Sequence, residues 1–442
     1  MSPPGRPKGD YRSAKHEGTP VRRRLITGAA VLCLIAALAI VWVLFMNLRD
    51  ESPRSATAAR VASAEQVSRG AYLALAGNCM GCHTAQGGAP YAGGRGVPTP
   101  FGTVIAPNLT PDDKTGIGAW SPDDFWRALH NGRSRDGRLL YPAFPYPNYT
   151  RIQRDDADAI FAWLRHVPAV EQANRPHELQ FPFNLQAALA VWRALYFRPG
   201  AHQADSQRSP EANRGAYLVE GLGHCNACHS RRNALGASTS PLDLAGGLIP
   251  VQNWYAPSLT SAQEAGVAAW EMQDIVDLLK TGVSPRGSVA GPMGDVVLGS
   301  TQHLSEPDLR AIAVHLKALP QTPPMETEAA PHAAAGPGAK LYERHCAGCH
   351  GDAGEGAAGA YPALAGNRAV TLPTVANLVH VVLEGGFPPA TEGNPRPYGM
   401  PPFATVLSVE ETAQLLSFVR GSWGNGAAAV SALEVERFRG TK

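Results

Sequence analysis

Six of the seven cysteines stand in three identical frames, in which two residues separate a pair of cysteines and a histidine follows at once. Two thiols about one helical turn apart can bond to two vinyl groups on one edge of a flat macrocycle, and the next residue can give its imidazole to the iron. This spacing is typical of c-type haem attachment and predicts three covalently bound haem c groups. The predicted residues are Cys79, Cys82 and His83 for the first haem, Cys225, Cys228 and His229 for the second, and Cys346, Cys349 and His350 for the third.

Paired cysteines also serve zinc sites and thiol–disulfide exchange, but both alternatives fit these frames less well. A zinc ribbon needs two such pairs for one metal, or distant histidines. A thioredoxin-type motif needs no following histidine and lies in a βαβ setting, which the sequence does not indicate. The seventh cysteine, Cys33, lies in an apolar run and is expected to be a small buried hydrophobic residue. No disulfide is therefore expected.

The sixth iron ligand of a low-spin cytochrome comes from a later loop, and methionine is its usual source. Only Met293 and Met400 lie in Pro/Gly-rich segments at the expected place, so we predict that they bind the second and third irons. The first unit has Phe144 there, which cannot bind iron. Its sixth ligand is left open: the iron is five-coordinate, or another side chain such as His130 or His166 binds it. Since methionine raises the potential of a haem, we expect the first haem to differ from the others.

The composition is that of a folded and nearly neutral protein. A length of 442 residues suggests about three domains. Hydrophobic residues make up 44% of the chain, which excludes wholesale disorder. The net charge is only +2, from 39 basic and 37 acidic residues, whereas a nucleic-acid partner would need a concentrated basic face.

An uncharged apolar run covers residues 25–46, which is long enough for a helix to cross a bilayer. Arg22, Arg23 and Arg24 precede it, so the positive-inside rule places residues 1–24 in the cytoplasm and the rest of the chain outside. A cleaved signal peptide is the alternative, although its apolar region is usually shorter. We expect an uncleaved anchor in a bacterial inner membrane and haem units in the periplasm.

Internal repeats divide the rest of the chain into units. The sequence RGAYL precedes the first motif at residues 69–73 and the second at 214–218. In both units a helical segment then ends at a glycine, Gly132 or Gly282. Each unit reads as helix, haem loop, middle helix, long loop and closing helix, which predicts an all-α fold of three tandem cytochrome c domains. Closing helices are expected at 156–167, 306–319 and 409–420, and the domains at 64–168, 212–320 and 338–424, with a tail at 425–442.

Two linkers separate the three expected domains. Residues 321–337 are rich in Pro and Ala, which favours an extended chain. Residues 169–211 contain the aromatic and apolar stretch 181–197. We expect a helix in this stretch that packs between the first two domains. The alternative is a docking surface for a partner subunit or the membrane, because exposed apolar patches mark interaction sites.

With these motifs the sequence resembles the membrane-bound three-haem cytochrome c subunits of bacterial periplasmic dehydrogenases. The resemblance rests on the haem motifs, on residues 69–73, and on the segments that carry the two methionines, GPM at 291–293 and YGMP at 398–401. It spans residues 64–423. Two features depart from the family. Many members have methionine in place of Phe144, and several are anchored at the C-terminus.

The resemblance implies an electron-transfer subunit without catalytic residues of its own. A catalytic dehydrogenase subunit of the molybdenum, quinoprotein or flavin type would reduce the haems, and membrane quinone or a downstream cytochrome or oxidase would accept the electrons. The chain itself shows no Gly-rich dinucleotide fingerprint. Two alternatives stay open: a cytochrome subunit of a terminal oxidase, and a haem enzyme that acts at an open first haem.

Overall fold

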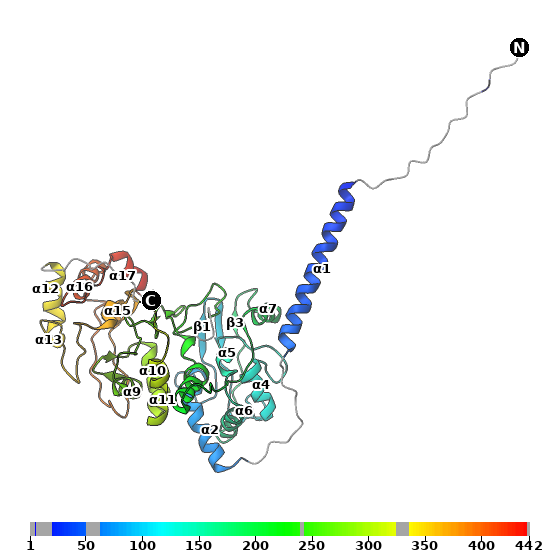
Figure 1. The fold of residues 1–442 in the computed structure, drawn as a ribbon, viewed down its shortest axis with the longest axis horizontal. Coiled ribbons are helices and arrows are strands. Elements are labelled where there is room, and N and C mark those ends of the chain that lie inside the picture. The colour runs from blue at the N-terminus through cyan, green and yellow to red at the C-terminus, as the bar shows by residue number, and fades with distance from the viewer. Residues whose placement is uncertain (1–4, 6–19, 50–61, 239–242, 324–335, 440–442) are drawn as a thin grey trace.

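The computed structural model describes Gly5 and residues 20–49, 62–238, 243–323 and 336–439. One long helix, α1, projects from a body in which short helices are joined by long loops (Figure 1). Most of the predicted cytoplasmic segment and most of the predicted Pro/Ala linker lie outside the described residues.

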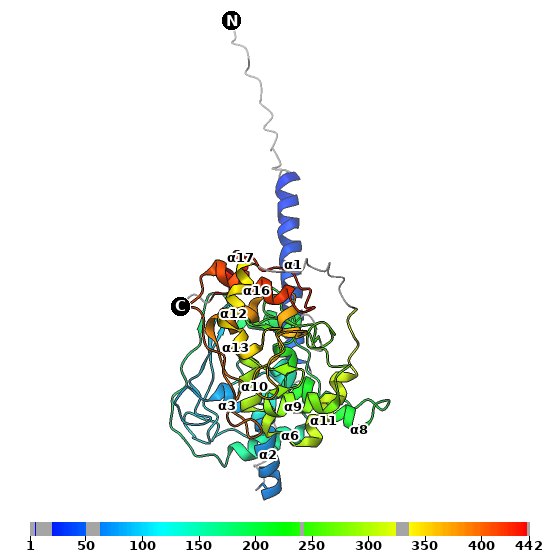
Figure 2. The same ribbon diagram turned by 90° about the vertical axis from the view of Figure 1, so that its left-hand side faces the viewer.

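Three pairs of helices form the framework of the body. Each pair joins the helix that precedes a haem motif to a helix much later in the chain. In Figure 2 the third pair, α12 and α16, faces the viewer. The pairs are α2 (Ala64–Ala76) with α6 (Arg154–Leu164), α8 (Pro210–Tyr217) with α11 (Glu306–Lys317), and α12 (Pro337–His345) with α16 (Val409–Gly421).

Glycine lets the two helices of each pair approach backbone to backbone. A Cβ atom added at Gly70 would lie 1.8 Å from the carbonyl oxygen of Ala159, far inside van der Waals contact. A Cβ added at Gly215 would lie 1.9 Å from the carbonyl oxygen of Ala311, and one added at Gly338 would lie 2.2 Å from a backbone oxygen of α16. The same crossing is therefore built three times, and no larger residue fits at its centre.

A middle helix follows each haem motif, and its ends have clear sequence causes. Ser121 and Asp124 form a reciprocal capping box at the start of α4. The first two middle helices end, as predicted, at glycines in the left-handed region, Gly132 with φ 57° and Gly282 with φ 81°. The middle helices are α4 (Pro122–Asn131), α9 (Met272–Thr281) and α15 (Ala376–Glu384).

The first two units share one hydrophobic core, and the third unit has its own. Leu73 of α2 and Leu218, which follows α8, belong to the same buried cluster. Val379 of α15 and Leu416 of α16 belong to the second cluster. Part of the predicted tail joins this second core, because Phe438 of the last helix is buried in it. The first two units therefore pack as one body.

An acidic residue on each closing helix joins the first two units. Asp156 of α6 accepts a hydrogen bond of 2.8 Å from Nε of Arg69 in its own unit. It accepts a second of 2.5 Å from the hydroxyl of Tyr217, which belongs to the second unit. The carboxylate is almost fully buried, so both donors compensate its loss of water.

The second unit repeats this arrangement in the opposite direction. Asp308 of α11 forms an ion pair of 2.7 Å with Arg214 of its own unit. It also accepts a hydrogen bond of 2.6 Å from the hydroxyl of Tyr72 in the first unit. The two tyrosines thus cross over between the units. In the third unit, Lys340 stands at the position of the two tyrosines and Glu411 at the position of the two aspartates. Glu411 caps its own helix instead of accepting a bond from another unit. This difference explains why the third unit is not paired in the same way.

The third unit docks on the second through a few specific contacts. The backbone of Tyr255 and the side-chain amide of Asn377 exchange two hydrogen bonds of 2.7 Å. The ring of Trp254 stacks on that of His380 with centroids 4.8 Å apart. Arg368 donates 2.7 Å to a carbonyl of the second unit. The linker is therefore not the sole connection between these units.

The predicted anchor and the predicted linker helix meet each other. Helix α1 (Pro20–Leu48) is long and apolar enough to cross a membrane, and α7 (Gln186–Tyr196) packs against its last turns. The amide of Asn47 donates 2.9 Å to the carbonyl of Ala190. Helix α7 also touches the second unit, where the indole of Trp192 donates 2.9 Å to a carbonyl. It begins later than expected, because residues 181–184 form a turn.

Short elements fill the long loops, including small antiparallel sheets that an all-α pattern did not predict. One sheet has the order β1-β2-β3, and two further sheets have two strands each. These elements are β1 (Gly96–Thr99), β2 (Gly102–Ile105), β3 (Glu178–Leu179), β4 (Gly247–Leu248) with β5 (Tyr255–Ala256), β6 (Val283–Ser284) with β7 (Gly287–Ser288), α5 (Tyr146–Tyr149), η1 (Leu218–Leu222), α10 (Pro292–Gly299), η3 (Thr301–His303), α14 (Arg368–Thr371) and α17 (Ala432–Phe438).

The helix crossing yields a first prediction. Gly70→Ala should lower the free energy of unfolding by about 3 kcal/mol, because the added methyl group meets backbone that cannot move aside. Gly200→Ala is the matched control, since open space surrounds its added Cβ. Denaturant unfolding of the full chain, followed by circular dichroism, measures both. Equal stability of the two variants would contradict the crossing.

The buried His315 of α11 yields a second prediction. Burial, supported by the nearby Arg208 and His202, lowers its pKa from 6.5 to about 4. Between these values the unfolded chain binds a proton that the folded chain does not, so stability falls as pH drops through this window. From pH 7.5 to 5 the loss from this residue is about 2 kcal/mol. In His315→Gln the measured pH-dependent loss of unfolding free energy should shrink by that amount; an unchanged loss would refute the prediction.

Candidate haem sites

Each haem motif follows the first helix of its unit after a tight turn. In the first two units the residue before the first cysteine is left-handed, with φ 48° at Asn78 and 37° at His224. The first cysteine of each motif packs against the core of its unit. The motifs themselves form α3 (Cys79–His83), a 3₁₀ turn (η2, Cys225–Ala227) and α13 (Ala347–His350).

The three motif histidines are held in the same way. A backbone carbonyl oxygen can only accept a hydrogen bond, so Nδ1 carries the hydrogen and donates it. The lone pair then lies on Nε2, the atom that an iron needs. Burial lowers the pKa of both His83 and His229, which favours the neutral form of these rings. The Nδ1-to-oxygen distances are 2.8 Å from His83 to Pro107, 2.7 Å from His229 to Pro257 and 2.9 Å from His350 to Pro362.

The cysteines fit haem attachment better than zinc binding or disulfide exchange. All six motif cysteines are free. Burial raises the pKa of Cys79 and Cys225 to about 12 and that of Cys346 to about 11, so these thiols are not activated for disulfide exchange, which uses thiolates. Within the part of the chain that the structure describes, no group of three His, Cys, Asp or Glu side chains could hold a metal ion. Two thiols and a neutral imidazole beside an apolar core are the set that haem c requires.

The two predicted methionine ligands lie against different cores. Met293 packs against the core shared by the first two units, and Met400 against that of the third. The expectation that Met293 lies in a loop was wrong, because it is the second residue of α10. Pro292 fits the first position of this helix, and Gly291 precedes it with φ 53° against the ring of Trp254.

The first unit places Phe144 against the shared core, which Met293 contacts from the second unit. The rings of Phe144 and Tyr149 lie 5.4 Å apart. The two histidines considered as alternatives make local contacts. His130 stacks on a tryptophan of its own helix at 4.4 Å, and Nδ1 of His166, which lies beyond the end of α6, is 2.8 Å from the carbonyl oxygen of Ala162 in that helix. These contacts offer no support for either histidine as the sixth ligand.

The loops of the first and second motifs interlock. The buried hydroxyl of Tyr149 donates 2.9 Å to the carbonyl of Gly77, and its ring meets His224 edge-on at 5.6 Å. One side chain, Tyr149, therefore ties together the turns that precede the first and the second motif.

The roles of the proline carbonyls, the tyrosine contacts and the docking of the third unit were not predicted from the sequence. The sequence does mark the prolines, because Pro107 and Pro257 occupy the same place in a repeated segment, APNLT at 106–110 and APSLT at 256–260. The tyrosines belong to the RGAYL repeat, but a repeat does not reveal which unit each side chain contacts. No comparable repeat marks Pro362.

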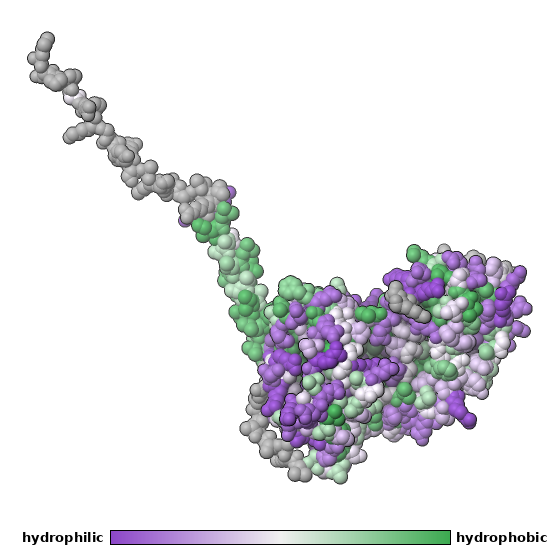
Figure 3. Space-filling model, turned by 180° about the vertical axis from the view of Figure 1, so that it is seen from behind, coloured by the Kyte–Doolittle hydropathy of each residue, from purple (hydrophilic) through white to green (hydrophobic). Residues whose placement is uncertain are grey.

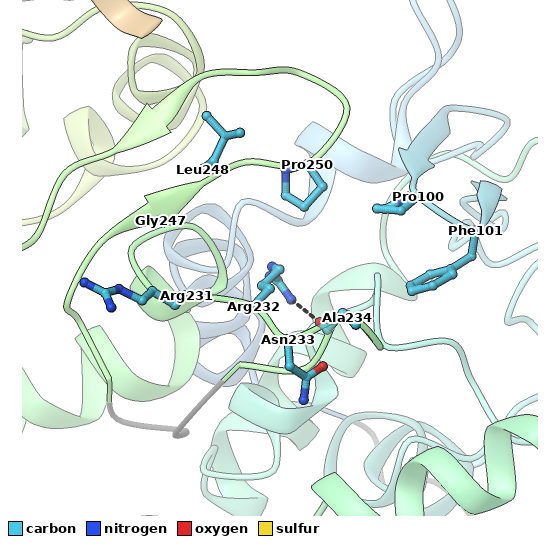
Figure 4. Close-up of a pocket in the computed structure, with 10 residues that line it drawn as sticks. Pro100, Phe101, Arg231, Arg232, Asn233, Ala234, Gly247, Leu248 and Pro250 are labelled. Carbon is cyan, nitrogen blue, oxygen red and sulfur yellow. Dashed lines mark hydrogen bonds between the residues drawn. The ribbon is translucent and has the colours of Figure 1, made fainter. Parts of the chain in front are cut away.

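A hollow of about 330 Å³ lies between the first two units, beside the second motif (Figure 4). Pro100 and Phe101 line it from the turn between β1 and β2, and Leu248 and Pro250 from the second unit. Arg232 donates 2.8 Å to a carbonyl of its own loop and a second bond to the carbonyl inside the second motif. No motif cysteine or histidine lines the hollow, so it is separate from the candidate haem sites.

Comparison with protein families gives two matching segments. The cytochrome c family model matches residues 67–168 and 335–423. The first segment contains the first motif and its closing helix, and the second contains the third motif and its closing helix. The second motif lies between them, within the part of the structure that pairs with the first unit.

Curated relatives match over most of the chain. The cytochrome c subunit of alcohol dehydrogenase (quinone) from Gluconacetobacter polyoxogenes is 38% identical over 395 residues, which are 85% of this chain and 84% of that protein. The gluconate 2-dehydrogenase cytochrome c subunit of Pantoea cypripedii is 37% identical over 428 residues, 92% of this chain and 94% of that protein. The fructose dehydrogenase cytochrome subunit of Gluconobacter japonicus is 32% identical over 441 residues, 92% of this chain and 89% of that protein.

Proposed function

We infer that this chain, which belongs to the family of cytochrome c subunits of dehydrogenases, carries electrons away from a catalytic dehydrogenase subunit. The acceptor is membrane quinone or a downstream cytochrome or oxidase. The partner subunit oxidises its substrate with a molybdenum, quinoprotein or flavin cofactor. This chain contributes no catalytic residue to that oxidation.

The observation that carries the proposal is the threefold repetition of one ligand geometry. In each motif two free thiols accompany an imidazole whose Nδ1 is bonded to a proline carbonyl. Such an outer bond fixes the ring and raises its strength as a ligand. A single haem would suffice for a small redox carrier, whereas three in one chain suit transport of electrons over distance.

We propose one haem c at each motif, in domains 64–168, 212–320 and 338–424. Met293 and Met400 are the proposed sixth ligands of the second and third irons. The haem supplies one-electron chemistry between ferric and ferrous iron. The residues of the chain do the rest: they attach the group, orient the imidazole and surround it with apolar side chains that exclude water.

The arrangement of the units supports exchange of electrons between all three sites. The first two motif loops are joined by Tyr149, whose hydroxyl bonds to Gly77 and whose ring meets that of His224. The third unit is docked to the second at Trp254, which lies against Gly291 beside the Met293 segment and stacks on His380 of the third unit. A contiguous body of this kind holds its redox groups at fixed separations.

We propose that α1 anchors the chain in a bacterial inner membrane, with the haem domains in the periplasm. The candidate span is Arg23–Leu48, and its most apolar stretch has no residue buried in the body. Arg23 and Arg24 stand at its start, as expected for the cytoplasmic side. Membrane attachment would bring the haem domains close to a quinone pool.

The proposed function predicts a specific partner. When the tagged full chain is purified in mild detergent from its host membranes, a dehydrogenase with a molybdenum, quinoprotein or flavin cofactor should accompany it in equal amount. Adding that enzyme's substrate should reduce the haem absorption bands, and a soluble quinone should reoxidise them. Co-purification of a haem–copper oxidase instead, or turnover of peroxide by the isolated chain, would contradict the proposal.

Phe144 predicts that the first iron lacks methionine. Per chain, the ferric protein should show two Met–iron charge-transfer signals, and the ferrous protein should bind carbon monoxide at one site. Phe144→Met should raise the signal to three and abolish the binding of carbon monoxide.

Met293→Phe is the matched control, because it repeats the natural difference in the second unit. It should leave one Met–iron signal and create a second carbon monoxide site. Three methionine signals in the unaltered chain, or no carbon monoxide binding, would show that the first iron has another strong ligand.

A further inference from the structure

Helix α7 turns an apolar face outward. Leu185, just before the helix, is 44% exposed, Val191 46% and Leu195 45%. Phe181 in the preceding turn is 79% exposed. From Gln186 to Tyr196 the helix has one charged residue only, so its outward face presents no charge to solvent.

That charged residue points into the protein. Arg193 is buried, its Nε donates 3.0 Å to the side chain of Asn47, and its guanidinium lies over the rings of Tyr146 and Phe197 at 5.3 and 4.8 Å. A surface helix in water has the opposite pattern, with charges outside and apolar residues inside. Leu189 and Ala194 are buried beside Arg193, so α7 is apolar on its inner face as well, and its outward face lacks the charges that contact with water favours.

The junction with α1 fixes the height of this face relative to a bilayer. The apolar run 25–46 has 22 residues, so as a helix it is about 33 Å long, close to the hydrocarbon thickness of about 30 Å. Asn47, the next residue, is bonded to Ala190 in the middle of α7. If α1 spans the bilayer, α7 lies at the boundary between hydrocarbon and headgroups.

The surroundings of α7 suit that boundary. Figure 1 shows α7 beside the end of α1, and Figure 3 shows the hydrophobic surface of α1 continuing onto the adjacent part of the body. Trp192, whose indole donates to a carbonyl, is the kind of residue that is enriched at membrane interfaces. Arg198 follows the helix and is exposed; its Nη1 donates to the carbonyls of Ala194 and Phe197, and the rest of its guanidinium can meet lipid phosphates.

We propose that the outward face of α7, together with Phe181, lies in the headgroup region of the leaflet from which α1 emerges. This inference rests on the proposed anchoring by α1. The membrane, rather than a partner protein, is the occupant because the face is uncharged, continuous with α1 and placed at the interface by the Asn47 contact. The body would then contact the membrane at two places, α1 and α7, which fixes its orientation. The hydrogen bond of Trp192 connects α7 to the loop after the second motif, so that loop is held in the same orientation.

Photo-crosslinking of the full haem-containing chain in nanodiscs of phosphatidylethanolamine and phosphatidylglycerol tests this proposal. The photoreactive residue p-benzoylphenylalanine replaces Val191, or Leu195 in a second preparation. Leu433, which is 80% exposed on the third unit, is the matched control, and Leu38 in α1 reports on the anchor. Mass spectrometry then identifies what has been captured.

We expect lipid adducts at positions 38 and 191, with a yield at 191 roughly tenfold above that at 433. Lipid at 38 with yields at 191 and 195 no higher than at 433 would overturn the α7 proposal and leave the anchor standing. Capture of a second protein at 191 would overturn it as well. Absence of lipid at position 38 would overturn the anchoring itself.

Discussion

A hydrogen bond from each motif histidine to a proline carbonyl ties the haem motif to the loop that follows it. It is made three times, at 2.7–2.9 Å, from loops that lie 12 to 28 residues beyond each histidine. The loop that carries this carbonyl lies between the first helix and the middle helix of its unit. The glycine crossing holds the start of that loop, because it packs the first helix directly against the closing helix without intervening side chains.

Charge placement then determines how the units assemble. The carboxylates of Asp156 and Asp308 are each satisfied by an arginine of their own unit and a tyrosine of the other. If the units moved apart, each carboxylate would keep the arginine of its own unit but lose the tyrosine hydroxyl of the other, so both of these crossing hydrogen bonds would be lost together. The third unit lacks these partners and attaches through Trp254 and Asn377. The first two units therefore form one body with a shared core, and the third unit has a core of its own.

Much of this architecture could be predicted from the sequence, because the positions and ends of helices depend mainly on residues that are close together in the chain. Closing helices expected at 306–319 and 409–420 occur at Glu306–Lys317 and Val409–Gly421, and the glycine stops at 132 and 282 were correct. Contacts between distant segments could not be predicted. The crossover of Tyr72 and Tyr217 and the meeting of Asn47 with α7 depend on tertiary packing, which leaves no periodic trace in the chain. The helical setting of Met293 was missed because its Pro and Gly neighbours indicate a loop equally well.

If each of the three motifs holds one covalently attached haem, the thioether bonds survive denaturation whereas axial ligands do not. Mass spectrometry of the denatured full chain should therefore give the mass of the chain plus three haem groups, with Cys33 as the one thiol that still reacts with an alkylating reagent. A mass increased by two haems or fewer, with a reactive cysteine pair at the empty motif, would contradict it.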